Sequence, residues 1–130
     1  MSNRNYREED AKYEISNKYE RFLKNRKTRK AALFNLKQEL KTVELDLRKD
    51  TRLHEILDIK ARKLIDIEDD LEDAMDAGAM KEDKAMPQIN KIEKKLRWYE
   101  QRVGFLTSVI EDDKAYIKVI KEFIQKYEVK

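Results

Sequence analysis

The sequence contains no cysteine and only one histidine, and these two shortages limit the chemistry available to it. Without thiols, neither disulfides nor thiolate metal sites can form, and a single imidazole is too few for most zinc and di-iron sites. A phosphate-binding glycine loop and a nucleophile elbow are also missing. We therefore predict no catalytic residue, no cofactor and no metal, and we expect that the protein is not an enzyme.

Long apolar runs are absent as well. No stretch approaches the roughly 18 uncharged apolar residues that a membrane span requires, and the opening segment MSNRNYREED has no apolar core of the signal-peptide kind. Charged residues instead make up 44% of the chain, with a net charge of only +3. We expect a cytoplasmic protein with no membrane partner.

Glycine and proline are scarce, with two and one in the chain. The clearest break in the pattern lies between Gly78, which can end a helix in the left-handed conformation, and Pro87, which is tolerated in the first turn of the next helix. We predict an N-terminal helical arm over 1–30, then a hairpin over 31–130. The hairpin would consist of a helix at 31–77, a turn at 78–86 and a helix at 87–129.

Hydrophobic periodicity is the feature that the sequence has in abundance. Apolar residues recur at alternating steps of three and four from Leu33 to Met75 and from Ile89 to Tyr127. Each stripe would be buried only against other helices. Acidic residues at the end of the first helix would lie beside basic residues at the start of the second. We predict an all-α fold, a long antiparallel helical hairpin (coiled coil), completed to a three- or four-helix bundle by the N-terminal segment or, by preference, by homodimerisation.

A few polar residues interrupt these stripes. An alignment that sets His54 opposite Asp113, with Asp50 one turn away, gives each polar group a partner. Sliding the helices by one heptad sets His54 against Leu106 and Asp113 against Leu47. Each polar group then lacks a hydrogen-bond partner, which costs about 1 to 3 kcal/mol per group. We favour the first alignment and predict a core polar layer of His54, Asp113 and Asp50. A histidine beside two aspartates also fits a catalytic site, but a structural layer is the commoner use.

A second apolar line runs beside the stripe of the second helix. It consists of Trp98, Phe105, Val109, Tyr116 and Phe123. In the first helix, further apolar residues lie outside the stripe: Leu53, Ile56, Ile59, Ile65 and Ile67. Two helices cannot cover this area, so we predict that a third helix or a second subunit packs on it. The alternative is a docking face for a different protein.

The densest basic segment, which we call the basic cluster, consists of Lys24, Arg26, Lys27, Arg29 and Lys30. By the favoured alignment it has no acidic counterpart in the hairpin, so it could bind nucleic-acid phosphates with little dependence on base sequence. The competing interpretation, which we favour slightly, is a solvated face that pairs with acidic residues of a neighbouring subunit. The candidates for that role are Glu8, Glu9, Asp10 and Glu14.

These patterns favour a non-catalytic protein–protein interaction module. It would be a scaffold, adaptor or inhibitor that presents helical surfaces to another protein or to a second copy of itself. The bias towards Lys, Ile, Asn and Tyr is typical of AT-rich genomes such as those of low-GC bacteria and their phages, which suggests a phage or mobile-element accessory protein. The alternative is a nucleic-acid-binding accessory or regulatory protein that uses the basic cluster.

Overall fold

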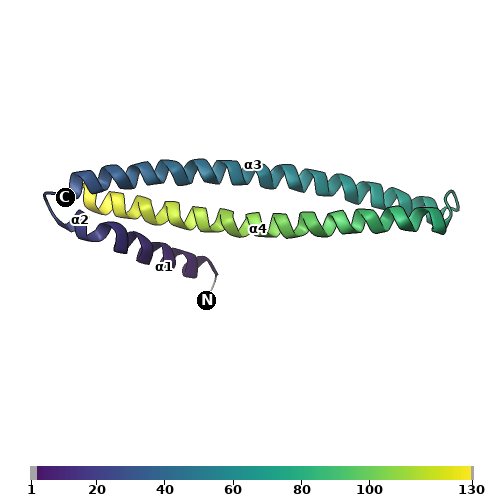
Figure 1. The fold of residues 1–130 in the computed structure, drawn as a ribbon, viewed down its shortest axis with the longest axis horizontal. Helices are drawn as coiled ribbons and strands as arrows, with labels where there is room; N and C mark the ends of the chain where they lie inside the picture. The colour runs from purple at the N-terminus through teal and green to yellow at the C-terminus, as the bar shows by residue number, and fades with distance from the viewer. Residues whose placement is uncertain (1–2, 130) are drawn as a thin grey trace. The chain divides into compact units, whose positions relative to one another are not determined.

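The computed structural model describes residues 3–129, with side chains from Tyr6 onward. The elements in chain order are α1 (Asn3–Ile15), a π-helical segment η1 (Ser16–Glu20), α2 (Arg21–Lys24), α3 (Arg29–Asp76) and α4 (Glu82–Glu128). Helices α3 and α4 pack as an antiparallel hairpin, and the described residues contain no strand (Figure 1). The predicted all-α hairpin is confirmed. None of the described helices combines the length and apolarity needed to cross a bilayer.

The turn of the hairpin is shorter than the predicted 78–86. Helix α4 begins at Glu82, so Pro87 lies inside the helix rather than in its first turn. Two acidic residues, Glu82 and Asp83, occupy the first turn, where negative charge is favourable at the positive end of the helix dipole. Ala85 is fully buried, which fixes this early part of α4 against its neighbours. At the other end of the hairpin, α3 begins at Arg29, two residues before the predicted start, after a turn over residues 25–28.

Gly78 ends α3 in the way that the sequence predicts. Its φ of 74° lies in the left-handed region, and among the described residues no other has a positive φ. The N–H of Ala79 donates to the carbonyl of Ala74 at 2.9 Å, and the N–H of Gly78 donates to the carbonyl of Met75 at 3.1 Å. This pair of hydrogen bonds is the Schellman arrangement, which satisfies carbonyls that the helix end leaves without partners.

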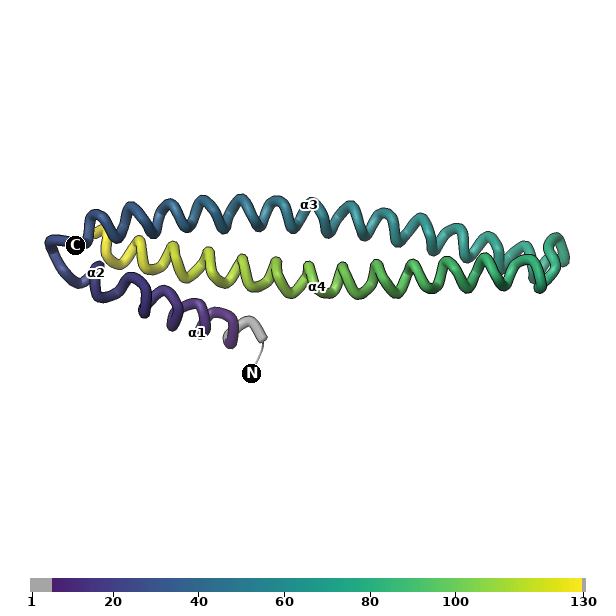
Figure 2. The backbone as a smooth tube through the Cα atoms, viewed as in Figure 1, coloured from purple at the N-terminus to yellow at the C-terminus, as the bar shows by residue number. Residues whose placement is uncertain are grey.

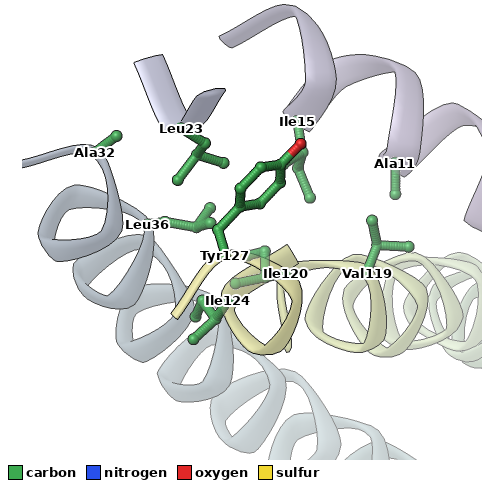
Figure 3. Packing of buried hydrophobic residues seen from close by; sticks show 9 residues of the cluster. All are labelled: Ala11, Ile15, Leu23, Ala32, Leu36, Val119, Ile120, Ile124 and Tyr127. Carbon is green, nitrogen blue, oxygen red and sulfur yellow. The ribbon is translucent and has the colours of Figure 1, made fainter. Parts of the chain in front are cut away.

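The chain divides into two compact units. Unit 1 contains the chain up to Asp50 together with Ser108 onward, and unit 2 is Thr51–Thr107. The N-terminal elements pack on the hairpin helices in unit 1, where the backbone trace places α1 and α2 alongside α4 (Figure 2). The buried cluster of unit 1 draws on all four α-helices: Ala11, Ile15, Leu23, Ala32, Leu36, Val119, Ile120, Ile124 and Tyr127 (Figure 3). The N-terminal segment therefore supplies the third layer here, one of the two predicted alternatives.

Unit 2 consists of the ends of α3 and α4 nearest the turn. Four of its buried apolar residues lie on the predicted stripes: Leu57, Ile89, Ile92 and Leu106. The fifth, Ala85, lies in the predicted turn and extends the second stripe by four residues towards the N-terminus of α4. Several large apolar side chains outside the stripes are exposed: Leu53, Ile56, Ile59, Ile65, Ile67, Met86, Trp98 and Phe105. Unit 2 thus buries one seam between two helices and leaves other apolar surface open.

The two glycines provide matched tests of backbone conformation. A methyl group added at Gly78 or at Gly104 would meet no other atom within 4 Å, so conformational preference decides both outcomes. Gly78→Ala should lower the free energy of unfolding by about 1 kcal/mol, because the left-handed conformation is unfavourable for alanine. Gly104→Ala, inside α4, should raise it by about 0.5 to 1 kcal/mol. Urea unfolding measures both; a Gly78→Ala variant as stable as the wild type would contradict the requirement for a left-handed residue.

Candidate interaction surfaces

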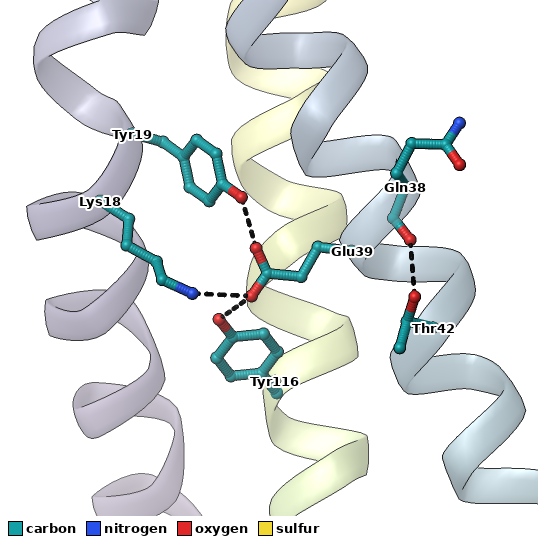
Figure 4. Close-up of polar contacts among 6 residues, drawn as sticks. All are labelled: Lys18, Tyr19, Gln38, Glu39, Thr42 and Tyr116. Carbon is teal, nitrogen blue, oxygen red and sulfur yellow. Dashed lines mark hydrogen bonds and ion pairs between the residues drawn. The ribbon is translucent and has the colours of Figure 1, made fainter.

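Glu39 of α3 is the most highly connected polar side chain in unit 1, and sequence reasoning did not identify it. Its Oε2 accepts a hydrogen bond from the Tyr19 hydroxyl at 2.5 Å, and its Oε1 accepts one from the Tyr116 hydroxyl at 2.5 Å (Figure 4). The Lys18 ammonium lies 3.3 Å from Oε1. Because Lys18 and Tyr19 belong to η1 and Tyr116 belongs to α4, this one carboxylate joins the N-terminal segment to both hairpin helices.

The protonation states of this cluster follow from its contacts. Burial alone would raise the pKa of Glu39, but the hydrogen bonds from Tyr116 and Tyr19 and the charge of Lys18 outweigh it and hold the pKa below its usual range. Burial, followed by the hydrogen bond and charge of Glu39, raises the pKa of Tyr19 to about 12 and raises that of Tyr116 as well. At neutral pH the carboxylate is therefore ionised and both phenols remain donors.

Surface ion pairs add further contacts within unit 1. Arg7 Nε lies 2.7 Å from Asp112 Oδ1, and Lys118 Nζ lies 3.0 Å from Glu8 Oε1. Glu8, which we considered as an acidic partner for a neighbouring subunit, thus has a partner in its own chain. Exposed pairs of this kind contribute about 0 to 1 kcal/mol each, so they orient α1 more than they stabilise it.

The predicted polar layer takes a different form. The Nε2 of His54 lies 3.1 Å from the Thr107 hydroxyl, next to Leu106 in the sequence, while Asp113 lies against Asp50. This corrects the predicted alignment: unit 2 lies close to the one-heptad alternative that we rejected. The described residues include no buried polar or charged residue, so these groups stay at the half-exposed border of the seam. The free-energy penalty for leaving these groups without the predicted partners is therefore reduced.

The surroundings of Asp113 disfavour its negative charge. Its Oδ2 atom has no hydrogen-bond partner among the described residues. Burial, followed by the neighbouring Asp50 carboxylate, raises the pKa of Asp113 to about 6. Folding therefore disfavours the ionised form of Asp113 relative to the protonated form.

The basic cluster lies at the α2–α3 turn, and two of its five residues serve the local fold. Arg29 Nε donates to the Leu23 carbonyl at 2.7 Å, which satisfies the end of α2. Lys24 forms an ion pair with Glu20 at 3.1 Å. The other three side chains are not fixed by ion pairs with described residues: Arg26, Lys27 and Lys30.

The predicted aromatic face is divided between the two units. In unit 1, Tyr116 and Phe123 pack against the buried cluster and Val109 is half-buried. In unit 2, Trp98 is 52% exposed and Phe105 is 64% exposed. The prediction that a third helix covers this line therefore holds for Tyr116 and Phe123, whereas Trp98 and Phe105 remain uncovered.

Unit 1 also contains a cavity of about 470 Å³ that sequence reasoning did not anticipate. It lies between the N-terminal segment and α4 and is lined by Lys12, Tyr13, Ser16, Glu20, Glu122, Phe123 and Lys126. Its two lysines and two glutamates do not favour a ligand of either charge. Over the described residues, no group of three or more histidine, cysteine, aspartate or glutamate side chains is arranged to hold a metal ion.

The Glu39 cluster gives a testable stability contribution. Glu39→Gln should lower the free energy of unfolding by about 1 to 2 kcal/mol, because hydrogen bonds to a charged acceptor are stronger than those to a neutral one. Hydrogen exchange should accelerate mainly in α1 and η1, which the carboxylate fastens to the hairpin. The neighbouring Gln38→Ala is the control, since Gln38 is exposed and should change stability by less than about 0.5 kcal/mol. Equal effects of both substitutions would contradict this role.

The Asp113 pair predicts a pH dependence. Because the folded-state pKa of about 6 lies above the ordinary 3.8, ionisation destabilises the folded state; this effect is complete above about pH 6 and fades as the pH falls towards 4. Asp113→Asn should therefore stabilise the protein by about 1 kcal/mol at pH 8, a value reduced for partial exposure, and by less at pH 5. Asp50→Asn should act in the same direction. A gain that does not vary between pH 5 and 8 in thermal unfolding would refute the assignment.

No protein-family model, curated protein sequence or solved structure matches this chain.

Proposed function

We propose that the chain is a non-catalytic protein–protein interaction module and that unit 2 carries its docking surface. We call this surface the unit 2 face and define it by five exposed apolar residues: Leu53, Ile56, Ile67, Trp98 and Phe105. The single observation that carries the proposal is their exposure in a unit whose two helices bury only one seam. Extended apolar patches of this kind usually mark interaction sites, and tryptophan and phenylalanine are enriched there.

The five residues share one side of the helix pair. In an antiparallel pair, the positions that directly precede seam residues on one helix lie on the same side as the corresponding positions of the other helix. The members of the unit 2 face precede His54, Leu57, Glu68, Tyr99 and Leu106, respectively, which are half-buried or buried. Aromatic and aliphatic groups from both helices therefore lie on one side of unit 2, where an amphipathic helix could dock.

This proposal is tested by comparing two sides of unit 2. We expect Phe105→Ser to abolish retention of a partner in a pull-down from the native source, whereas Ile65→Ser should not, because Ile65 follows the seam residue Leu64 and lies on the opposite side. Both residues are exposed, so both variants should keep the wild-type stability within about 0.5 kcal/mol. Identical retention by all three proteins would reject the unit 2 face. Light scattering measures self-association, the predicted homodimer, in the same samples.

A second candidate function, nucleic-acid binding, is favoured by one observation. Three cations at or next to the α2–α3 turn are exposed and have no ion pair to a described residue: Arg26, Lys27 and Lys30. A flexible set of cations of this size can neutralise a few phosphates and gives weak, salt-sensitive binding.

The nucleic-acid alternative has its own charge-matched test. Replacing Arg26, Lys27 and Lys30 together by glutamine should abolish binding to mixed-sequence DNA or RNA at about 50 mM salt. A triple variant that removes the same charge elsewhere in unit 1, at Lys41, Lys49 and Lys121, should bind as the wild type does. Equal losses in both variants would indicate only a net-charge effect, and no binding by the wild type at low salt would end this alternative.

A further inference from the structure

We propose that the unit 2 face binds an acidic amphipathic helix of a different protein. This inference rests on the proposed docking function and adds the chemistry of the partner. It follows from the charges that surround the apolar residues, because these charges are sharply segregated between the two sides of unit 2.

The side that carries the unit 2 face is basic. The exposed cations that directly precede seam residues are Lys60, Lys63, Lys84, Lys91, Lys95 and Arg102, with Asp70 as the one carboxylate. The opposite side, made of residues that directly follow seam residues, is acidic. Its carboxylates are Glu55, Asp58, Asp69, Glu72, Asp76, Glu93 and Glu100, beside Arg62 and Arg97. All five residues of the unit 2 face thus lie on the basic side, whereas the acidic side carries the exposed apolar residues Ile65 and Met86.

The cations lie close to the apolar residues of the face. The Arg102 guanidinium carbon is 5.8 Å from the centre of the Trp98 ring. Lys95 lies one helical turn before Trp98, and Lys60 and Lys63 fall between Ile56 and Ile67 on α3. Apolar residues and cations therefore alternate along this side of both helices.

This combination selects the partner by two complementary requirements. The aliphatic and aromatic groups are removed from water only by another apolar strip, and a helix provides one at spacings of three and four. The lysines among the apolar residues are complemented when the positions that flank the apolar strip of the partner helix are glutamate or aspartate. An amphipathic helix with an acidic polar face meets both requirements.

Two other occupants fit less well. A symmetric dimer would bring the same patch together with itself, so the cations of the two copies would lie close to one another. A nucleic acid could pair with the cations and stack on Trp98, but it offers no apolar strip for the aliphatic residues Leu53, Ile56 and Ile67.

The experiment uses the full chain and the fluorescence of Trp98, its only tryptophan. The probes are two synthetic amphipathic helices of about 18 residues, roughly 27 Å long, with identical apolar positions and with either glutamate or lysine at the flanking positions. We expect the glutamate peptide to shift the emission to shorter wavelength and to bind at least about tenfold more tightly than the lysine peptide at low salt.

Charge-reversed variants assign the effect to one side of unit 2. Lys60→Glu combined with Lys95→Glu should weaken binding of the glutamate peptide by about tenfold or more. The control, Arg62→Glu combined with Arg97→Glu, makes the same change in net charge on the opposite side and should weaken it by less than about threefold, because salt screens distant charges. Circular dichroism verifies that both variants keep their helix content.

The outcomes separate this inference from the proposed function. Equal binding of both peptides, or equal effects of the two double variants, would overturn the acidic partner while leaving a protein-docking face in place. Shielding of Trp98 by a second copy, seen as a dimer in light scattering, would replace the partner with the chain itself. A response of Trp98 to mixed-sequence single-stranded DNA or to anionic lipid vesicles, with none to either peptide, would overturn both proposals.

Discussion

Burial of the apolar seam between α3 and α4 is the interaction on which the other contacts depend. Charged residues occupy most of the remaining surface of both helices, so the seam is the main apolar area that each can remove from water. The ion pairs between elements are largely exposed and add little. Where the seam lies therefore determines which residues face outward, and these outward residues decide what else can pack on the hairpin helices.

The two units use the same kind of seam with different results. In unit 1, the N-terminal segment covers the second apolar line of α4, and the Glu39 carboxylate holds it there through Tyr19 and Tyr116. The largest fully buried side chains, Tyr127, Ile15, Leu23, Leu36, Ile120 and Val119, all belong to this unit. Unit 2 has fewer fully buried groups, so it should open locally at a lower free energy. A partner that covers Trp98 and Phe105 would supply the apolar contacts that the N-terminal segment provides in unit 1.

Periodicity and turn chemistry carried most of the fold information in the sequence. The three-four spacing identified both long helices, and Gly78 marked the turn because few residues tolerate its left-handed conformation. Pro87 was a weaker guide, since acidic residues before it start the helix earlier. The alignment was missed because we paired polar groups with one another, although His54 and Asp113 are only half-buried. Glu39 could not be singled out, because a glutamate in a charged helix looks like any other until Tyr19 and Tyr116 are brought to it.

Charge segregation in unit 2 also bears on whether its exposed apolar residues would associate with further copies of the chain. A face meant for a partner must expose Trp98 and Phe105 when the partner is absent, which invites association with further copies. Cations placed among the apolar residues would oppose symmetric self-association and attract a partner of the opposite charge, so the same lysines would serve both attraction and discrimination. The basic cluster of unit 1 is built differently, because Arg29 and Lys24 are engaged in closing the α2–α3 turn. The two groups of cations therefore differ in their surroundings, and it is the apolar residues beside Lys60 and Lys95 that distinguish the proposed docking face.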